Sequence, residues 1–237
     1  MLLALDTSTS AITVALHDGS AVAARACELD ARSHGERLAP LIQAAFDQAG
    51  VGPEAVTAVV VGEGPGPFTG LRVGLVSAAV FAWARGLPAY GLCSLDALAW
   101  QAMGVAAAGG PAAALPAGGR LLVATDARRK EVYWATYDVT GGLPVRLDGP
   151  AVGRAAALDE RIRELPAVGR GPELYGDALN AWLPDASVRD VDAGALAELA
   201  ARRLAGGETL SPPTPRYLRR PDAQPQAGVP PLAGAPA

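Results

Sequence analysis

Two short segments of the sequence contain residues whose types and spacing could bind phosphate. The first, DTSTS, offers hydroxyl groups, backbone N–H groups and a carboxylate, and it consists of Asp6, Thr7, Ser8, Thr9 and Ser10. The second, GEGPGPFTGLRVGL over residues 62–75, is rich in glycine and leads into an apolar run. Because glycine-rich turns that precede a helix often surround phosphate groups, both segments are candidates for a nucleotide site.

The glycine-rich segment lacks the specific patterns of a phosphate loop. The P-loop pattern ends in Gly-Lys-Ser/Thr, whereas leucine and arginine follow Gly70. No G-x-G-x-x-G is completed from Gly62 or Gly64. Pro65 and Pro67 also remove two backbone donors from the turn. Small residues on a helix allow another backbone to come close, so the segment predicts a packing surface, either against a partner or inside the monomer.

The DTSTS segment allows two interpretations. It joins two strand-like runs, where its N–H and hydroxyl groups could face a nucleotide and Asp6 could lie near a metal. It contains neither lysine nor glycine, so it could equally be a hydroxyl-rich turn in which Asp6 caps local N–H groups. We treat it as a candidate vestigial nucleotide loop.

Histidine and cysteine are too few and too scattered to indicate a metal site. His17 and His34 are the only histidines, and Cys27 and Cys93 are the only cysteines. Because a zinc-type site needs three or four closely arranged ligands, we expect no metal, and the distant cysteines do not suggest a disulfide framework. A Ser or Cys nucleophile with a histidine partner stays a weak alternative, since no Gly-x-Ser-x-Gly elbow occurs.

Composition narrows the class of protein. The chain has 237 residues, which fits two small domains at about 100–150 residues each. Half of the residues are apolar and the net charge is −4, so unaided binding of nucleic acid is not expected. The first residues lack the basic region of a signal peptide, and the longest apolar run is too short to cross a bilayer. We therefore expect a cytoplasmic protein that does not enter a membrane.

The order of elements in the first hundred residues predicts an α/β fold. Three strand-like runs (LLALDTS, AITVALHD and SAVAARACEL) precede a helix that Ser33 and Glu36 begin as a capping box and Gly50 ends. The β-branched run AVTAVVVG predicts a buried parallel strand, and a helix over roughly 71–85 follows. A strand, LPAYGLC, and a helix, LDALAWQAMG, complete the unit. This order is the ribonuclease H-like layout, the repeating unit of the actin and sugar-kinase superfamily.

The second half of the sequence repeats the beginning of the first. LLVATDARRKEVYWATYDV starts a new strand meander after a low-complexity stretch at 104–119. Its charged turn could be a solvated hairpin tip or a docking patch, and a helix is expected around Asp192 to Leu204. We predict one ribonuclease H-like domain over residues 1–108 and a second over 109–220, whose last residues could pack back on the first. A disordered tail is expected over 221–237.

Four segments, in this order, resemble the TsaB (YeaZ) family: LALDTSTSAITVAL, GEGPGPFTGLRVGL, DARRKEVYWATYD and PRYLR. That family is a bacterial subunit of the machinery that makes threonylcarbamoyladenosine (t6A) at position 37 of tRNAs reading ANN codons. The resemblance implies an actin-like (ASKHA) fold of two ribonuclease H-like domains. It also implies a non-catalytic scaffold whose paralogue, TsaD, carries the transferase site.

The resemblance also implies partners and an interface. TsaD-like proteins hold a metal with a His-x-x-x-His motif, and the corresponding positions here are Ser94 and Leu98. The chain is expected to bind TsaD as a heterodimer, to be joined by the ATPase TsaE, and to form a homodimer in isolation. No cofactor of its own is expected; ATP or ADP and tRNA would bind only in the larger complex.

Two helices of the first domain would form the partner interface. Carried over to this sequence, the interface comprises His34, Leu38, Leu41, Ile42, Ala45, Phe46, Gly70, Leu71, Val73, Gly74, Ser77, Ala78 and Phe81. Two alternatives stay open, namely an actin-like ATPase that uses the DTSTS segment and a peptidase.

Overall fold

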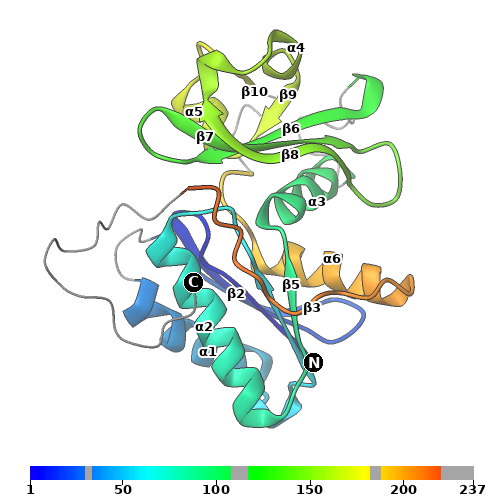
Figure 1. The fold of residues 1–237 in the computed structure, drawn as a ribbon. Coiled ribbons are helices and arrows are strands. Elements are labelled where there is room, and N and C mark those ends of the chain that lie inside the picture. Colours follow the sequence, from blue (N-terminus) through cyan, green and yellow to red (C-terminus); the bar gives the residue numbers. More distant parts are fainter. Residues whose placement is uncertain (30–33, 108–116, 182–187, 220–237) are drawn as a thin grey trace, which may run out of the picture.

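The computed structural model describes residues 1–29, 34–107, 117–181 and 188–219, which form a mixed α/β structure with two five-stranded sheets (Figure 1). The first sheet has the order β3-β2-β1-β4-β5 and is built from β1 (Leu2–Asp6), β2 (Ala11–His17), β3 (Val22–Leu29), β4 (Ala58–Gly62) and β5 (Ala89–Leu92). Its first three strands are antiparallel, and β4 and β5 run parallel to β1.

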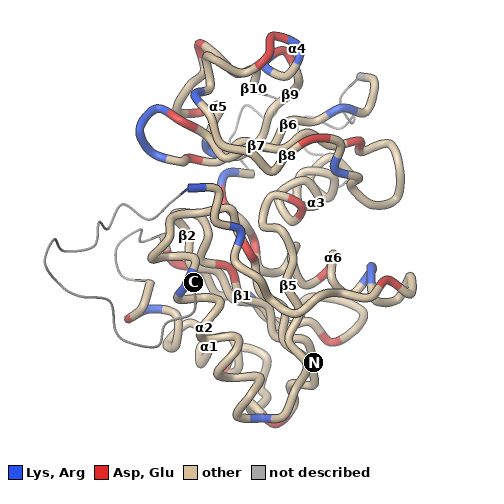
Figure 2. Tube along the Cα trace, in the orientation of Figure 1, with Lys and Arg blue, Asp and Glu red and all other residues tan. Residues whose placement is uncertain are grey.

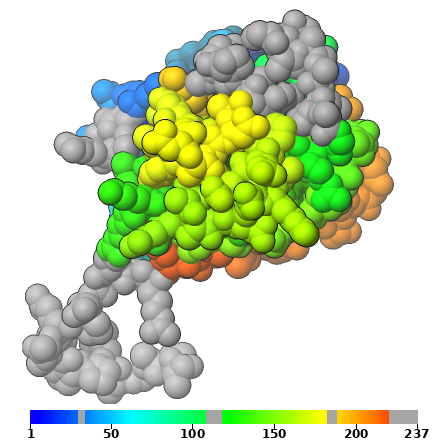
Figure 3. Space-filling view, turned by 90° about the horizontal axis from the view of Figure 1, so that it is seen from above, coloured from blue at the N-terminus to red at the C-terminus, as the bar shows by residue number. Residues whose placement is uncertain are grey.

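The second sheet repeats this arrangement. Its order is β8-β7-β6-β9-β10, with β6 (Arg120–Asp126), β7 (Glu131–Asp138), β8 (Val145–Arg154), β9 (Pro166–Val168) and β10 (Asn180–Ala181). An antiparallel meander of three strands is again followed by two parallel strands on the other side of the first. Seen from above, the green and yellow residues of this half lie together, with orange residues at the right and red-orange residues below them (Figure 3).

Within the described residues, six α-helices pack around the sheets. They are α1 (His34–Ala49), α2 (Phe68–Arg85), α3 (Ser94–Ala107), α4 (Glu160–Arg163), α5 (Arg170–Leu174) and α6 (Ala193–Ala205). Helices α1 and α2 pack on one face of the first sheet, and α6 packs on the opposite face. Helix α3 lies between α6 and the second sheet (Figure 1). Helices cover both faces of β4, so Val59, Val60 and Val61 are all fully buried. This explains why the sequence of that strand is continuously apolar.

The predicted elements are confirmed, with differences at their ends. Helix α2 begins at Phe68 rather than near Leu71, because Pro67 already occupies the N-cap position. Asp192 caps α6 by accepting a hydrogen bond from the Gly194 N–H, close to the expected start of that helix. The predicted cap Ser33, much of the 104–119 stretch and the predicted tail lie outside the described residues.

The end of the chain returns to the first half. The largest hydrophobic core runs from the first sheet through α6 and α3 to the second sheet. Beyond α6, the Gly91 N–H donates to Ser211 O, and the Arg216 N–H donates to Glu63 O. The predicted division at residue 108 stays a prediction, but α6 and the segment after it pack on the sheet formed by the first hundred residues. In the described part of the chain, no helix combines the length and apolar character needed to cross a bilayer.

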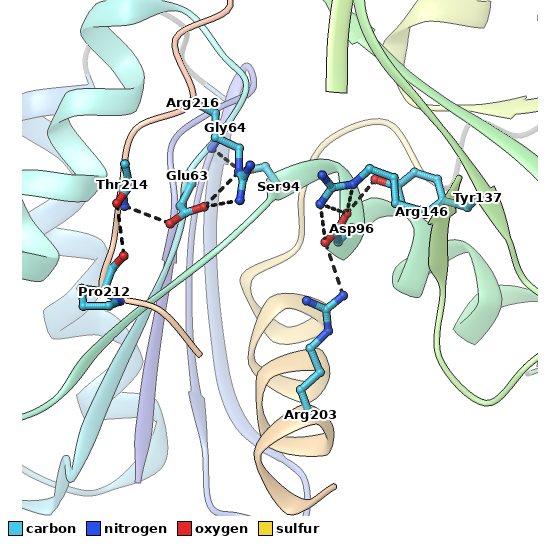
Figure 4. Close-up of polar contacts among 10 residues, drawn as sticks. All are labelled: Glu63, Gly64, Ser94, Asp96, Tyr137, Arg146, Arg203, Pro212, Thr214 and Arg216. Carbon is cyan, nitrogen blue, oxygen red and sulfur yellow. Dashed lines mark hydrogen bonds and ion pairs between the residues drawn. The ribbon is translucent and has the colours of Figure 1, made fainter. Parts of the chain in front are cut away.

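A buried carboxylate on α3 connects the two halves. Asp96 is 3% exposed and accepts hydrogen bonds from the Tyr137 hydroxyl at 2.8 Å and from the Arg146 guanidinium at 2.8 Å (Figure 4). Arg203 of α6 approaches its other oxygen at 3.3 Å. One side chain thus joins α3 to β7, β8 and α6. Burial and the neighbouring carboxylate raise the pKa of Tyr137, so its hydroxyl stays a donor at neutral pH.

We expect Asp96→Ala to lower the free energy of unfolding by roughly 3–5 kcal/mol, because it leaves two guanidinium groups and a buried hydroxyl without their acceptor. Urea unfolding measures this change. Glu28→Gln is the control, since the Glu28–Arg37 pair lies at the surface with side chains 34% and 53% exposed and should be worth at most about 1 kcal/mol. Equal losses in both variants would contradict the role of Asp96.

Candidate functional site

The DTSTS turn is held in place by its own carboxylate. Asp6 is fully buried, and its Oδ1 accepts hydrogen bonds from the Ser8 N–H at 2.8 Å and the Ser8 hydroxyl at 2.7 Å. Its Oδ2 accepts a hydrogen bond from the Ser94 hydroxyl at 2.6 Å. Burial raises the pKa of Asp6, while the hydrogen bonds from Ser94 and Ser8 oppose that rise. Both oxygens are therefore engaged with donors of the chain itself, as in the capping interpretation.

The glycines of α2 make room for this turn. The Thr7 hydroxyl donates to Gly70 O at 2.8 Å and accepts from the Gly74 N–H at 3.0 Å. A Cβ atom at Gly70 would lie 2.9 Å from Thr7 O, and one at Gly74 would lie 2.5 Å from Thr7 Oγ1. The close approach is thus intramolecular. Of the two interpretations of these glycines, the structure favours packing inside the monomer, because the space that a side chain would need is already filled.

The glycine-rich segment also binds the end of the chain. The Glu63 carboxylate is 3% exposed and accepts hydrogen bonds at 2.9 Å from Arg216 and from the Thr214 N–H (Figure 4). Next to this pair, the rings of Phe68 and Tyr217 lie 4.8 Å apart. Sequence analysis missed Glu63 and Arg216, although a lone glutamate in a Gly/Pro-rich run and an arginine in PRYLR were visible.

The charged turn between β6 and β7 meets the same segment. Arg219 forms an ion pair with Glu131 and donates to Ala127 O. The Tyr133 hydroxyl lies 3.5 Å from Gly66 O, across the junction of the halves. All four family-like segments, which are far apart in the sequence, therefore converge at one place.

A pocket of about 480 Å³ lies where these segments meet. Its wall comes from Ser8, Thr9 and Ser10, from the start of α2, from the β6–β7 turn and from residues 217–219. Asp6 and Thr7 do not line it, because they point into the protein. Arginines of the second half and of the C-terminal segment contribute to the wall, and Figure 2 shows basic positions on the β6–β7 turn and near the end of the described chain.

The two positions that correspond to the metal-binding histidines of TsaD-like proteins, and the buried cysteine beside them, belong to the packed interior. Ser94 binds Asp6 and the Gly64 N–H, and Leu98 is fully buried in the core. Burial raises the pKa of Cys93 to about 12, so its thiol is protonated at neutral pH. Within residues 1–29, 34–107, 117–181 and 188–219, no three His, Cys, Asp or Glu side chains come together as a metal site would require.

The two histidines contact backbone atoms. His17 Nδ1 accepts a hydrogen bond from the Gly19 N–H at 3.0 Å, and His34 Nε2 lies 3.3 Å from Thr9 O. His34, which the sequence suggested as a surface or interface residue, is only 7% exposed. It packs beside the DTSTS turn.

The predicted partner interface divides into buried and accessible residues. His34, Leu38, Ala45, Phe46, Gly70, Leu71, Gly74 and Ala78 are buried within the chain itself. Leu41, Ile42, Val73, Ser77 and Phe81 are half-buried. The structure does not include a partner, so the interface stays a prediction, and only the second group is accessible to one.

Helix α2 exposes large apolar residues that sequence analysis missed. Val76 and Val80 are each 59% exposed and Trp83 is 85% exposed. We call these three residues, together with the half-buried Val73, Ser77 and Phe81, the α2 face. Their spacing places them on one side of the helix. Because α2 is apolar on nearly every side, the sequence alone could not show which side faces the core.

Comparison with known proteins now adds to this geometry. The model of the TsaD family, described as tRNA N6-adenosine threonylcarbamoyltransferase, matches residues 27–170. The tRNA threonylcarbamoyladenosine biosynthesis protein TsaB of Escherichia coli K12 is 32% identical over 232 residues, which cover 92% of this chain and 94% of that protein. The chain belongs to the TsaB (YeaZ) family.

Two further matches extend over nearly the whole chain. The solved structure of YeaZ from Pseudomonas aeruginosa superposes with a TM-score of 0.74 at 32% identity, covering 92% of this chain and 99% of that one. An uncharacterized protein of Mycobacterium tuberculosis H37Rv is 42% identical over 229 residues, or 95% of each chain. The family resemblance of the four segments is confirmed.

We expect Gly74→Ala to destabilise the protein by about 1–3 kcal/mol, because the new methyl group would displace the Thr7 hydroxyl from its two hydrogen bonds. Gly104→Ala is the matched control, since it lies in α3 with open space around it and should be neutral or stabilising by up to about 1 kcal/mol. Thermal or urea unfolding distinguishes the two. Equal changes in stability for the two variants would contradict the conclusion that Thr7 leaves no room for a side chain at Gly74.

A second prediction concerns pH. The folded protein binds the Asp6 proton more tightly than the unfolded chain, because burial raises its pKa above 3.8. As the pH falls through the window between the raised pKa and 3.8, the wild type should therefore gain stability relative to Asp6→Asn, whose amide does not titrate. Urea unfolding of both proteins at several pH values between 7 and 4 tests this. A difference that does not change with pH would contradict it.

Proposed function

We propose that this chain is the non-catalytic scaffold subunit of a t6A-synthesising complex, in which it binds and activates a TsaD-like transferase. The complex would act on adenosine 37 of tRNAs that read ANN codons. Family membership supports the process, and the observation that carries the scaffold role is the α2 face. Val76, Val80 and Trp83 form an apolar surface on one helix, of the kind that marks protein–protein contact sites.

The arrangement of α1 and α2 supports a helical docking surface. The two helices lie next to each other on the first sheet, and the Phe46 and Phe81 rings are 6.4 Å apart (Figure 1). Half-buried Leu41 and Ile42 of α1 extend the apolar surface beyond α2. The buried members of the predicted interface would then support the accessible ones without contacting a partner. When no TsaD-like partner is present, a second copy of this chain could cover the same apolar surface. We therefore expect a homodimer in isolation.

We further propose that the two halves are ribonuclease H-like domains of the actin-like (ASKHA) superfamily. The support is that the two sheets have the same order and the same strand directions. The domains would extend over residues 1–108 and 109–220, with α6 and residues 210–216 packing on the first.

Two residues support the proposal that this chain is not itself catalytic. Where TsaD-like proteins would place metal-binding histidines, Ser94 supports the DTSTS turn and Leu98 fills the core. Leucine has no atom that binds a metal, and the Ser94 hydroxyl is already hydrogen-bonded to Asp6 and to the Gly64 N–H. TsaE, tRNA and ATP or ADP would then join only through the complex, which we place in the cytoplasm.

Two other functions are less well supported. An ATPase that relies on Asp6 would need its carboxylate in the pocket, whereas both oxygens are bound to Ser8 and Ser94. A peptidase that relies on Cys93 would need an accessible thiolate, whereas that thiol is buried and protonated. Reconstitution tests the scaffold role, since transfer of threonylcarbamoyl to tRNA by this chain alone would contradict it.

We expect Val80→Glu to prevent co-elution with the TsaD-like partner on a sizing column, because it places an unpaired charge within an apolar contact. Val145→Glu is the matched control, since Val145 is 57% exposed, against 59% for Val80, and lies on β8 of the other half. Both variants should fold normally, which circular dichroism can verify. Unchanged co-elution of Val80→Glu, or equal loss in both variants, would contradict a docking role of α2.

A further inference from the structure

A single charged residue interrupts the exposed apolar stripe of α2. Arg72, Val76, Val80 and Trp83 follow one another at intervals of four, four and three residues, so they lie on one side of the helix. Arg72 is exposed, as the other three are. The only other charged residue of α2 is Arg85, in its last turn. A partner that covers the α2 face would therefore also cover the guanidinium group of Arg72.

Two aromatic rings hold this guanidinium in place. Its Cζ lies 3.9 Å from the centroid of the Phe68 ring, and its Nε donates a hydrogen bond to the Tyr217 hydroxyl at 3.0 Å. Tyr217 belongs to the segment after α6, which is itself fixed by the pairing of Arg216 with Glu63. The Arg72 side chain is therefore restricted before a partner arrives, so less conformational entropy is lost when it binds an acceptor.

Arg72 forms no ion pair within the part of the chain that the structure describes. Its contacts there are with the Tyr217 hydroxyl and with the rings of Phe68 and Tyr217. A guanidinium has five N–H groups, and the hydrogen bond to Tyr217 uses only the one on Nε. The four N–H groups on the two Nη atoms are thus available to an acceptor from outside the chain.

The guanidinium lies at an open groove on the surface of α2. This groove has a volume of about 450 Å³ and is lined by Phe68, Thr69, Arg72, Val73, Val76 and Ser77. We call it the Arg72 groove. Its wall is mostly apolar, and three of its residues also belong to the α2 face. A partner docked on the α2 face would therefore place side chains in the Arg72 groove.

A docked partner would remove water from Arg72, so it must supply an acceptor. A desolvated guanidinium that lacks hydrogen-bond partners is strongly unfavourable. A carboxylate can accept two parallel hydrogen bonds from the planar fork, whereas a single carbonyl oxygen neither matches the fork nor balances the charge. The chemistry of the groove therefore fits an aspartate or glutamate side chain that is surrounded by apolar residues of the partner.

A second copy of this chain does not supply such a group from α2. The helix contains neither aspartate nor glutamate, so a contact between two α2 faces brings two arginines together without a carboxylate from either helix. On α1, the other helix of the predicted interface, the acidic residues are Glu36 and Asp47, near its two ends. Arg72 therefore disfavours an α2-to-α2 homodimer and favours a different chain that carries a carboxylate at this position.

We propose that Arg72 selects the partner by binding one of its carboxylates: an Asp or Glu side chain of the TsaD-like subunit enters the Arg72 groove and pairs with the guanidinium, and this pair is absent from a homodimer. This inference rests on the proposed function, since it names the chemistry of the chain that covers the α2 face. The apolar residues of the face would supply most of the buried area, and the ion pair would determine specificity and orientation.

Calorimetry with the full-length chain and the TsaD-like subunit, at low and high salt, tests the proposal. Arg72→Met keeps an unbranched side chain but removes the charge, so it should weaken binding by about tenfold or more and reduce its dependence on salt. Arg72→Lys keeps the charge without the planar fork and should have an intermediate effect. Arg85→Met is the matched control, since Arg85 is exposed on the same helix but lies off the stripe, and it should bind as the wild type does.

Val80→Glu separates this proposal from the docking role of α2. Loss of binding in Val80→Glu together with wild-type binding by Arg72→Met would leave the docking role intact and overturn carboxylate recognition. No binding by the wild-type chain would overturn both. Sedimentation measures self-association, which should be no weaker in Arg72→Met than in the wild type. A homodimer weakened as much as the complex would contradict a role of Arg72 in choosing the partner.

An exchange of charges identifies the acceptor. Arg72→Glu should abolish binding to the TsaD-like subunit, and replacing one acidic surface residue of that subunit by arginine should restore it. Circular dichroism verifies that each variant folds. If no acidic residue of the subunit restores binding when it is replaced, the acceptor is not a carboxylate and the proposal is wrong.

Discussion

A buried carboxylate that needs a partner determines where the end of this chain lies. Glu63 is nearly inaccessible to water, and an unpaired carboxylate in that position would be strongly unfavourable. Arg216 and the Thr214 N–H supply the missing partners (Figure 4). Once they are in place, Tyr217 reaches Phe68 and Arg219 reaches Glu131, so the segment that follows α6 passes from the first half to the second. The shape of the pocket depends on this path.

Asp96 acts in the same way on the opposite side of the junction. Its contacts with Arg146 and Arg203 join a strand of the second half to the last helix, which itself packs on the first sheet. Two buried charge networks thus connect halves that also share a continuous apolar core. Such networks restrict the relative orientation of the halves, because each charge has only a few partners with suitable geometry. Under the proposed scaffold role, this arrangement would present α2 to a partner in one orientation.

The pocket and the α2 face are connected through α2. The first turn of that helix lines the pocket, its buried side binds the DTSTS turn through Gly70 and Gly74, and its outer side carries Val76, Val80 and Trp83. The glycines that suggested a phosphate loop instead allow α2 to pack closely against the DTSTS turn. The basic residues of the pocket come instead from the β6–β7 turn and from Arg170, Arg189 and Arg219.

The order of strands and helices could be predicted from the sequence because its signals are local. The β-branched run of β4, the glycine after α1 and the Asp192 cap each act within a few residues, and the four family-like segments identify the family without a structure. The contacts between these segments could not be predicted. Glu63 and Arg216 are 153 positions apart, and Thr7 and Gly74 are 67 apart, and nothing local marks such pairs.

The sequence likewise could not predict which side chains of α2 are exposed. In a helix that is apolar on all sides, an apolar residue can face either the core or the solvent. The sequence by itself therefore determined the family and the elements of the first half and of the second meander, but not the short elements between Val145 and Ala181. Only the tertiary structure decided at which glycines other residues of the chain occupy the space for a side chain. It also decided which apolar side chains stay exposed and which arginines line the same pocket. Those properties arise when distant segments pack together and compete for the same space and the same hydrogen-bond partners.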